Sequence, residues 1–523
     1  MLPQNWDIEL ADLNVHPLSD EQWNNADIIC TGGMLPQQGG ILALVERAKA
    51  EGKYVVVGGP DPTSQPALYH QANAKVLGEG ERSIPLWLES WKNGEPNGTF
   101  ETKETTDIST TPVPRFDLIS FNDYLYVGLQ TSRGCPYNCE FCDVIELFGR
   151  KPRVKGPEQF VKELDRLYEL GYRGWIDIAD DNFIGNRLKT KPVLAEIANW
   201  QSKRKYPFIF STEASVNLAD DDELLGLMRE SQFRYVFLGI ETPDQRVLSQ
   251  TQKKINTVKP LIDRVHRIYD FGISVTAGFI LGFDSEPDDC DDALIDFIQE
   301  SGIMLAMVGL LVALPNTQLT KRLAKERRLI SSDHKWLKNS NETYFLESGT
   351  HDQTGGGLNF ITVRDRAEIY RQLHRVITEV YAPKAFMDRV LYVTSRIKLQ
   401  SKHSWGGWEY RRMLRGFVYL SWQLLKRKDT RWLFLRNCWK SLWMGRPQFD
   451  FANQLMGSYL HFSKQTDLIR KQLEVSIKYE NEQTNYPRSV SEMNLPIQES
   501  LPIVTCEPNP KIKIAVQTAS VSG

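Results

Sequence analysis

Between about residues 124 and 328 the sequence repeats one pattern six times: a short apolar run with strand character is followed by an amphipathic helical stretch. The first apolar run is YLYVGLQTS and the last is IMLAMVGLLVAL, and the helical stretches include PEQFVKELDRLYEL. A strand, a crossover helix and the next strand form a right-handed βαβ unit with parallel strands. Six such units are too few for an eight-stranded barrel, so the pattern predicts an open, partial (β/α)6 barrel of the TIM type over residues 123–330.

Residues 1–100 show a shorter version of the same alternation. The segments WDIELADL, ADIICTGG, KYVVVGGP and AKVLGEGE read as strands, and ILALVERAKAEG reads as a helix. The continuous apolar run 54–57 suits a strand that is buried on both faces of a parallel sheet. Glycine pairs follow two of these strands, where open α/β sheets bind ligands, although such pairs also make simple tight turns. The pairs are Gly32 with Gly33 and Gly58 with Gly59.

The remaining segments differ in composition. Residues 101–122 are rich in Thr, Ser, Asp and Pro, so we expect a linker between two domains. Residues 331–480 lose the strand alternation and predict an α-helical C-terminal domain. Residues 481–523 are polar, Pro-rich and aperiodic, which predicts a disordered tail. The expected fold class is therefore α/β, with a Rossmann-like domain, a partial barrel and a helical domain in that order.

Charge and hydropathy exclude several classes of protein. The chain has 63 Lys and Arg against 66 Asp and Glu, so it is no polybasic nucleic-acid binder and we expect no nucleic-acid partner. It contains no run of eighteen apolar residues, and its first residues lack the basic and apolar regions of a secretory signal. These features predict a cytoplasmic protein. Seven cysteines in 523 residues are too few for a disulfide scaffold.

Three of the seven cysteines lie within eight residues, directly after the first strand of the predicted barrel. They are Cys135, Cys139 and Cys142, with the spacing C-x3-C-x2-C. A structural zinc site requires four ligands, and no second CxxC or HxxxH pattern lies nearby. A [4Fe-4S] cluster bound by three thiolates leaves one iron open to a small molecule. A zinc site completed by a distant residue and unrelated core cysteines remain as alternatives.

The segment from Thr131 to Cys142, with an aromatic residue before the third cysteine, resembles the signature of radical S-adenosylmethionine (SAM) enzymes. The resemblance implies that the three cysteines bind the cluster, that the open iron binds the amino and carboxylate groups of SAM, and that Phe141 lies beside the adenine. It extends over residues 1 to about 480. The N-terminal segment resembles the cobalamin-binding domain of the B12-dependent class, and GLNFITVRDRAEIYRQLHRVITEVYAP resembles a helical C-terminal domain of unassigned function.

The resemblance also implies SAM contacts at the ends of later strands. Asp180 and Asp181 stand where the family usually has a Gly-Gly-Glu-like motif that receives the SAM amino group. We expect one of these carboxylates to accept from that ammonium, although clustered acids on a loop are often simply solvated. The other expected positions are Glu213 after the third strand, Gly239 and Glu241 at the fourth, and Leu281 and Gly282 after the fifth. The last two could equally serve packing, and no general acid or base can be assigned.

Two features bear on the expected cobalamin site. Many cobalamin-binding domains carry Asp-x-His-x-x-Gly, and this chain has only Asp12 and His16 at a different spacing, so we expect cobalamin to bind without a protein histidine. Relatives begin with a strand, a loop and a helix ahead of the segment equivalent to residues 2–6, so we expect either that the true start lies upstream of Met1 or that this domain lacks its first strand. The loops expected to line the corrin are those with Gly32, Gly33, Gly58 and Gly59.

Between Lys402 and Arg446 the sequence has eleven Lys or Arg against two acids, together with six Trp. Indole rings and cations together favour a membrane interface, which would place the protein peripherally at the inner face of the membrane. One alternative is an ordinary helical domain that buries its tryptophans and solvates its arginines. A weaker one is nucleic-acid binding, because no recognised nucleic-acid module accompanies these residues.

The resemblance implies a B12-dependent radical SAM enzyme, and most simply a methyltransferase that acts on an unactivated carbon. In the implied reaction an electron from the reduced cluster cleaves SAM, a 5′-deoxyadenosyl radical takes a hydrogen from the substrate, and methylcobalamin supplies the methyl group. The segment CDVIELFGR is similar to hopanoid C-2 methyltransferases, which favours an apolar small molecule or lipid as substrate. An electron donor such as flavodoxin or ferredoxin is implied as a partner. The alternatives are a radical SAM enzyme without methyl transfer, like the anaerobic magnesium-protoporphyrin monomethyl ester cyclase, and a non-catalytic metal-dependent binding protein.

Overall fold

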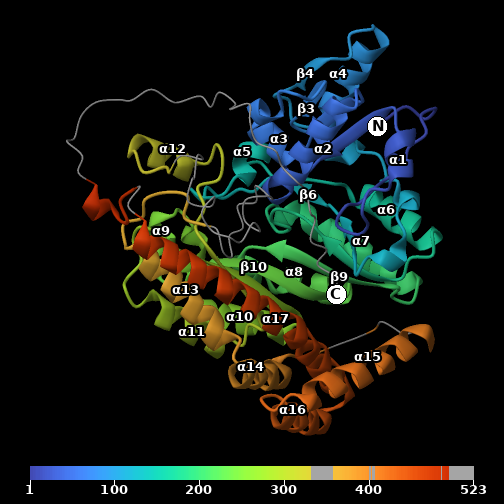
Figure 1. Ribbon diagram of the computed structural model, residues 1–523. Helices are drawn as coiled ribbons and strands as arrows, with labels where there is room; N and C mark the ends of the chain where they lie inside the picture. The colour runs from blue at the N-terminus through green and yellow to red at the C-terminus, as the bar shows by residue number, and fades with distance from the viewer. Residues whose placement is uncertain (331–356, 400–401, 403–406, 484–485, 494–523) are drawn as a thin grey trace.

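The structure is a computed structural model, and it describes residues 1–330, 357–399, 402, 407–483 and 486–493, the side chains of 407–410, 412 and 413 excepted. The chain forms two parallel sheets followed by a helical region (Figure 1). The N-terminal α/β domain lies at the top of the view, the larger sheet lies at the centre, and the C-terminal helices lie along its lower side.

The larger sheet has six parallel strands in the order β12-β11-β10-β9-β8-β5, so each strand pairs with its neighbour in sequence. A helix follows each strand before the next one begins, which confirms the predicted partial (β/α)6 barrel. The strands are β5 (Val127–Leu129), β8 (Gly174–Ile178), β9 (Phe208–Ala214), β10 (Phe233–Glu241), β11 (Ser274–Leu281) and β12 (Leu305–Leu310). The helices are α6 (Pro157–Glu169), α7 (Arg187–Lys203), α8 (Asp222–Glu230), α10 (Leu261–Asp270), α11 (Cys290–Ser301) and α12 (Gln318–Lys325).

The alternation of burial in β11 shows how the strands form this sheet. Val275, Ala277 and Phe279 are at most 1% exposed, and the Phe279 ring lies 6.0 Å from the ring of Phe297 on α11. Because successive side chains point to opposite faces, the alternate residues Thr276 and Gly278 face the inside of the barrel, where burial is only partial. The helix-facing side of β11 therefore supplies the core, and its inner side is less completely buried.

The N-terminal sheet has four parallel strands in the order β1-β2-β3-β4. They are β1 (Ile28–Gly32), β2 (Tyr54–Gly58), β3 (Ala74–Leu77) and β4 (Gly98–Glu101), and the main covering helices are α2 (Gln38–Ala50) and α4 (Gly80–Lys92). β2 is central and its three valines are buried, as the sequence predicted. β1 lies at one edge of the sheet and β4, which was not predicted, lies at the other.

The prediction of a strand at WDIELADL is wrong. Residues 5–13 form no strand, and Trp6 instead packs edge-on against Trp87 and Trp91 of α4, with ring centroids 5.9 and 5.8 Å apart. The indole of Trp6, which suggested a strand, therefore packs against a helix instead. β1 in turn pairs with β2 alone, and no described strand covers its other edge.

The segment between the two domains contains three short 3-10 turns, η3 (Ile108–Thr110), η4 (Phe116–Leu118) and η5 (Phe121–Asp123). Phe116 inserts into the core of the barrel domain and is 6% exposed. A few buried side chains thus dock this polar segment, even though its composition could not support a core of its own.

Five α-helices follow the barrel in the part of the chain that the structure describes: α13 (Arg366–Val380), α14 (Pro383–Arg396), α15 (Gly407–Lys426), α16 (Arg431–Met444) and α17 (Arg446–Glu482). This confirms the predicted helical C-terminal domain. Arg366 of α13 and Glu480 of α17 form a buried ion pair at 2.9 Å, with each side chain 2% exposed. Among the described residues, no helix combines the length and the apolar character needed to cross a membrane.

The predicted disordered tail begins too early. α17 continues to Glu482, and beyond it Arg488 pairs with Asp365 at 2.6 Å while the Val490 amide donates to the Thr362 carbonyl at 2.8 Å. These contacts hold residues 486–493 against the start of α13. Residues 494–523, the remainder of the predicted tail, lie outside the described residues.

Candidate active site

The three clustered cysteines lie on one loop at the carboxyl end of β5, the edge at which barrels of this type place their chemistry. The loop folds back because β6 (Ser132–Arg133) pairs antiparallel with β7 (Arg153–Val154). Gly134 between them has φ +89°, and a Cβ there would lie 2.8 Å from the Gly149 carbonyl oxygen, so only glycine fits. The Cys135 amide donates to the same carbonyl at 3.3 Å.

Asp180 at the end of β8 fixes the start of the cysteine loop. Its side chain is 1% exposed, and each carboxylate oxygen accepts two hydrogen bonds. The donors are the backbone amides and the hydroxyl groups of Thr131 and Ser132. Burial raises the pKa of Asp180 to about 6, although these donors lower it. Asp180 is thus fully engaged by the protein and acts as a positioning residue for the loop.

Asp181 and Asn182 lie closer to the cysteines. Asp181 is only partly buried, and its Oδ2 accepts from the Gly134 amide at 2.8 Å. The amide nitrogen of Asn182 lies 3.7 Å from the Cys135 sulfur and 3.2 Å from the Ser215 hydroxyl. Of the two expected aspartates, Asp181 is therefore the one that keeps carboxylate surface available to a ligand.

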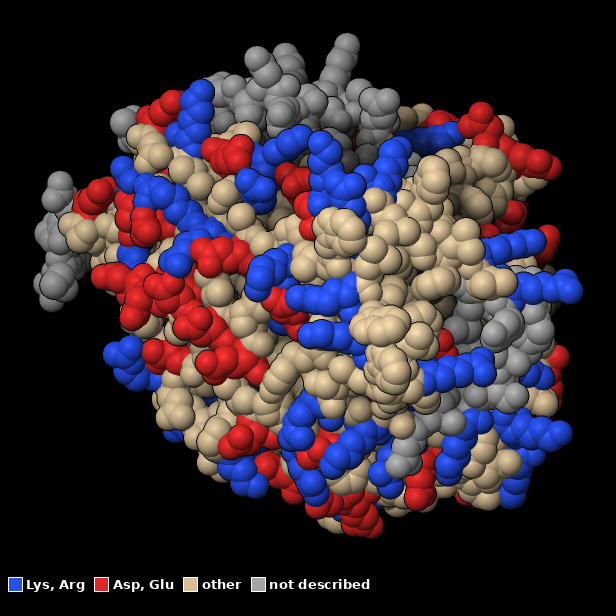
Figure 2. All heavy atoms as spheres, turned by 90° about the horizontal axis from the view of Figure 1, so that it is seen from below, with Lys and Arg blue, Asp and Glu red and all other residues tan. Residues whose placement is uncertain are grey.

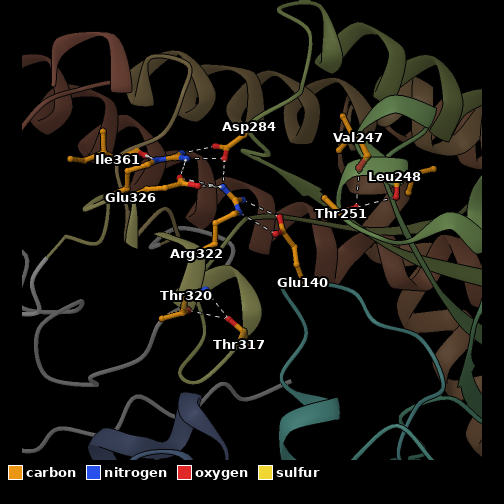
Figure 3. A network of polar contacts seen from close by, with 11 residues as sticks. Glu140, Val247, Leu248, Thr251, Asp284, Thr317, Thr320, Arg322, Glu326 and Ile361 are labelled. Atoms are coloured by element: carbon orange, nitrogen blue, oxygen red, sulfur yellow. Dashed lines mark hydrogen bonds and ion pairs between the residues drawn. The ribbon is translucent and has the colours of Figure 1, made fainter. Parts of the chain in front are cut away.

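A second brace reaches the cysteine loop from the end of the barrel (Figure 3). Glu140, between the second and third cysteines, accepts from Arg322 of α12 at 3.0 Å, and Arg322 also donates to Asp284 at 2.8 Å. The Leu319 amide donates to the Glu140 carbonyl at 2.8 Å. In Figure 3, Glu140, Asp284 and Arg322 point toward one another from the cysteine loop, from the segment after β11 and from α12. Helix α12, in the last βα unit of the barrel, thus holds the cysteine loop that follows the first strand, β5.

The chemistry of the three thiols fits a metal cluster. Burial raises the pKa of Cys139, and it raises the pKa of Cys142 to about 12, so neither thiol would ionise at neutral pH without a cation in place of its proton. Within the described residues, the three sulfurs do not converge on one point as the ligands of a single metal ion do. A [4Fe-4S] cluster requires no such convergence, because each thiolate binds a different iron.

Carboxylates line the ends of β8 and β9. Glu213 lies near the carboxyl end of β9 with an exposed side chain, although the surrounding protein still withdraws much of its solvent. This burial raises the pKa of Glu213 to about 7, and the negative charges of Asp177, Asp181 and Asp180 raise it further. A carboxyl group in this setting favours a positively charged neighbour, so the mouth suits a ligand with an ammonium or sulfonium group.

Glu241 ends β10 in a strained conformation. Its φ is +67°, which costs of order 1–3 kcal/mol for a residue other than glycine. Its carboxylate is bonded to the buried ammonium of Lys253, and a Cβ on Gly239 would lie 2.7 Å from both groups. Burial lowers the pKa of Lys253, but the Glu241 carboxylate and the nearby Cys139 raise it more, so the ion pair is maintained. A side chain at position 239 would therefore have to displace the ends of Glu241 and Lys253.

The remaining barrel positions divide between the site and the core. Phe141 is half-buried, its ring lies 5.7 Å from that of Phe283, and the Lys253 ammonium lies 5.9 Å from its ring centre. Leu281 is 2% exposed and belongs to the core. Gly282 has φ +108°, and a Cβ there would lie 2.6 Å from the side chain of Leu358. Phe141 therefore remains partly exposed on the cysteine loop. Leu281 and Gly282 instead serve packing, which was the alternative role expected for them.

The glycine pairs of the N-terminal domain lie at the carboxyl ends of β1 and β2. A Cβ on Gly32 would collide with the Gly58 carbonyl oxygen, and a Cβ on Gly59, whose φ is +91°, would lie 3.1 Å from the Gly33 amide nitrogen. The close approach that the glycines permit is therefore between the two strand ends themselves. His16 is exposed and its Nε2 lies 3.5 Å from Asp123 in the interdomain segment.

The N-terminal domain meets the barrel next to the cysteine loop. Arg133 pairs with Glu79 at 3.1 Å and with Glu81 at 2.6 Å, and Arg153 pairs with Glu79 at 2.6 Å. Glu79 and Glu81 lie at the start of α4, after β3. These ion pairs keep the strand ends of the small sheet near the cysteine loop of the large one.

Lys253, Asn182 and Arg322 contribute to this arrangement and were not among the expected site residues. Asn182 was within reach of sequence reasoning, because it follows the two aspartates directly. Lys253 and Arg322 lie in ordinary helix and turn segments with other charged residues, and they carry no local signal.

Comparison with known proteins agrees with this geometry. The radical SAM superfamily matches residues 129–298, which run from β5 to α11. An uncharacterized methyltransferase of Synechocystis is 37% identical over 90% of this chain and 86% of its own length. The chain belongs to the radical SAM enzyme family. The predicted family and enzyme class are confirmed, and this family implies a [4Fe-4S] cluster and SAM as cofactors.

Three further matches extend the comparison beyond the radical SAM superfamily model. The hopanoid C-2 methylase of Rhodopseudomonas palustris is 35% identical over 67% of this chain and 66% of its own length. OxsB, a cobalamin-dependent SAM radical enzyme, shares the fold with a TM-score of 0.52 and 16% identity over 87% of this chain and 72% of its own. A domain of unknown function (DUF4070) matches residues 317–475, which run from α12, the last helix of the barrel, into α17.

Proposed function

We propose that this radical SAM enzyme is a B12-dependent methyltransferase that adds a methyl group to an unactivated carbon of an apolar substrate such as a hopanoid lipid. The observation that carries the proposal is the cysteine loop at the barrel mouth beside an α/β domain, in a chain 35% identical to a hopanoid C-2 methylase. The methyltransferase with which it shares 37% identity over most of both chains supports the same reaction class.

In this proposal Cys135, Cys139 and Cys142 hold the cluster. When bound, the cluster and cobalamin supply reductive cleavage of SAM and a transferable methyl group. Asp180 and Arg322 hold the loop that would carry the cluster in place at the barrel mouth. Phe141 offers an aromatic face to the adenine, and Asp181 and Glu213 offer carboxylates to the SAM ammonium or sulfonium charge. An external electron donor such as flavodoxin or ferredoxin would reduce the cluster.

The N-terminal domain would hold cobalamin between its strand ends and the barrel mouth. Gly32, Gly33, Gly58 and Gly59 bring the carboxyl ends of β1 and β2 close together at that edge. His16 stays with Asp123, so the proposal includes no histidine ligand to cobalt. Paramagnetic resonance of the bound cob(II)alamin with nitrogen coupling from His16 would contradict this part.

The test uses the full chain, reconstituted anaerobically with iron, sulfide and hydroxocobalamin. The reaction mixture contains a strong reductant, a hopanoid and SAM with a deuterated methyl group. We expect it to form 5′-deoxyadenosine and a hopanoid that carries the labelled methyl group. Replacing Cys135, Cys139 and Cys142 by Ala should abolish the cluster absorbance and both products. Absence of 5′-deoxyadenosine from the reconstituted wild type would reject the radical reaction. 5′-Deoxyadenosine without label transfer to any lipid would favour chemistry of the cyclase type.

A further inference from the structure

Helices α15 and α16 lie side by side at the lower end of the molecule (Figure 1), and each presents one face to the body of the protein. On α16 this inner face consists of Phe434, Asn437 and Ser441, which are at most 2% exposed. The Asn437 amide donates to the Met387 carbonyl of α14 at 2.7 Å. The inner face of α16 thus combines one aromatic side chain with two polar ones. The tryptophans of this helix lie on its outer face.

The outer face of α16 carries three tryptophans that contact no core. Trp432, Trp439 and Trp443 are 72%, 63% and 75% exposed. They are spaced by seven and four residues, so they share one side of the helix, together with the exposed Leu435 and Leu442. An exposed indole is rare in a folded protein, and three on one helix face form an apolar surface without a partner in the described structure.

α15 extends this surface. Its exposed apolar side chains recur every three or four residues and so lie on one side of the helix. They are Leu414, Val418, Trp422 and Leu425, with Tyr419 next to them. Leu420 and Leu424, on the opposite side, are buried at 6% and 0% exposure. The outward-facing residues of α15 and α16 together are called the α15–α16 face below.

Cations surround this apolar surface. Figure 2 views the molecule from the end at which α15 and α16 lie, and it shows a broad area without acidic side chains that is crossed and bordered by Lys and Arg. Among the described residues, no carboxylate pairs with five exposed cations of the two helices and the turn between them, in contrast to Arg427, which pairs with Asp429 at 3.0 Å. The five are Arg411, Arg415, Lys426, Lys428 and Lys440.

We propose that the α15–α16 face binds the surface of a membrane that contains anionic lipids. Indole rings are most stable at the depth of the lipid headgroups, and unpaired cations at their sides meet the lipid phosphates. A second copy of this chain fits less well. A two-fold interface would bring the five cations against the same five cations, and lysine is depleted in protein interfaces.

The position of this face has a consequence for the enzyme. α5 (Val144–Phe148), which follows the cysteine loop, lies at the other end of the molecule in Figure 1. Binding through the α15–α16 face therefore leaves the barrel mouth open to SAM and to an electron donor. The inference does not depend on the proposed methyl transfer, because lipid binding is measured without cofactors or substrate.

The test is co-sedimentation of the full chain with vesicles of phosphatidylcholine, alone or with phosphatidylglycerol. We expect the wild type to sediment with the anionic vesicles at low salt and to be released several-fold as salt rises, because screening weakens each contact. Each engaged cation contributes about fivefold to partitioning, so changing all five to Gln should lower binding at least tenfold. Changing Trp432, Trp439 and Trp443 to Ser should lower binding at every salt concentration.

A matched control changes Lys49, Lys92 and Lys203 to Gln, three exposed lysines outside this face. This variant should sediment like the wild type. Brominated lipids should quench the fluorescence of the wild type more than that of the triple tryptophan variant, which locates the indoles in the lipid. All the changed side chains are exposed, so unaltered circular dichroism checks that each variant is folded.

Three results would overturn the proposal: wild type that stays in solution with anionic vesicles at low salt, a five-cation variant that binds as well as wild type, or a wild-type dimer that the tryptophan changes dissociate. Failure of lipid binding with 5′-deoxyadenosine formation intact would reject this inference and leave the proposed function standing. Lipid binding without 5′-deoxyadenosine formation would reject the proposed function and leave this inference standing.

Discussion

Asp180 and Asp181 are adjacent in the chain but differ in their partners, and their conservative variants should differ in the same way. Asp180→Asn places an amide NH2 group among the donors of Thr131 and Ser132, so we expect a loss of about 1–3 kcal/mol in stability and poor retention of the cluster. Asp181→Asn should fold and hold the cluster normally but bind SAM several-fold more weakly, because it loses a charge near the mouth. Thermal denaturation, cluster absorbance and equilibrium dialysis with SAM measure these effects.

The reverse pattern would contradict these roles. If Asp180→Asn kept wild-type stability and lost SAM binding, Asp180 would be the ligand carboxylate. Ser132→Ala removes one donor to Asp180 and provides a milder control for the brace.

Glu213 should make the stability of the cofactor-free protein depend on pH. Its pKa is raised from 4.5 to about 7, so the folded state holds this proton more tightly than the unfolded state does. Wild-type stability should therefore fall as pH rises through that window, and Glu213→Gln should escape the loss. Because the side chain is open to solvent, we expect a relative gain of only about 1 kcal/mol for Glu213→Gln between pH 5 and pH 8.

The measurement is a series of melting temperatures for wild type and Glu213→Gln across this pH range. Glu230→Gln, at an exposed position on α8, is the control and should leave the pH profile unchanged. A constant difference between wild type and Glu213→Gln at all pH values would show that Glu213 carries an ordinary pKa.

The sequence predicted the helices and strands of the barrel well because each strand is a short, mainly apolar run and each strand alternates with a helical stretch. Both signals are local and follow from burial on two faces or on one. The strand prediction for WDIELADL was wrong because apolar residues can pack on a helix surface as well as in a sheet, and Trp6 packs on α4. The partners of the cysteine loop were beyond prediction for a different reason: Arg322 lies 182 residues from Glu140, and only the closed fold brings them together.

The parallel pairing of β1 with β2 should depend on Gly32. An added Cβ would meet backbone atoms of Gly58, which cannot rotate away as a side chain would. We expect Gly32→Ala to destabilise the N-terminal domain by about 2 kcal/mol or more and to weaken cobalamin binding. Gly40→Ala in α2 is the matched control, since nothing lies within 4 Å of the new Cβ and alanine favours the helix by about 1 kcal/mol.

Circular dichroism melting and cobalamin titration compare the two glycine variants. If Gly32→Ala melted and bound like wild type, the approach of the two strand ends would be looser than the structure shows.

Glu79 links the two domains, since it alone pairs with both Arg133 and Arg153 in the described structure. Burial raises its pKa, but the arginines lower it more, so the carboxylate is ionised. Glu79→Gln should leave two partly buried guanidinium groups without full compensation, at a cost of about 2 kcal/mol, and loosen the domains. We expect faster proteolytic cleavage within residues 101–122 and a lower melting temperature.

Glu95→Gln, an exposed change in the same domain, serves as the control for Glu79→Gln. Equal cleavage rates for the two variants and wild type would mean that contacts other than these ion pairs hold the domains together.

The brace between Glu140 and Arg322 also sets an order of events during synthesis. A ribosome that adds about 5–20 residues per second delivers Arg322 roughly 10–40 seconds after Glu140, because 182 residues separate them. Throughout that interval the three cysteines stand on a loop without its final support, where thiols are open to oxygen and to stray metals. We therefore expect iron and sulfide to be inserted only after α12 has folded, so that maturation of the protein waits for the last unit of its barrel.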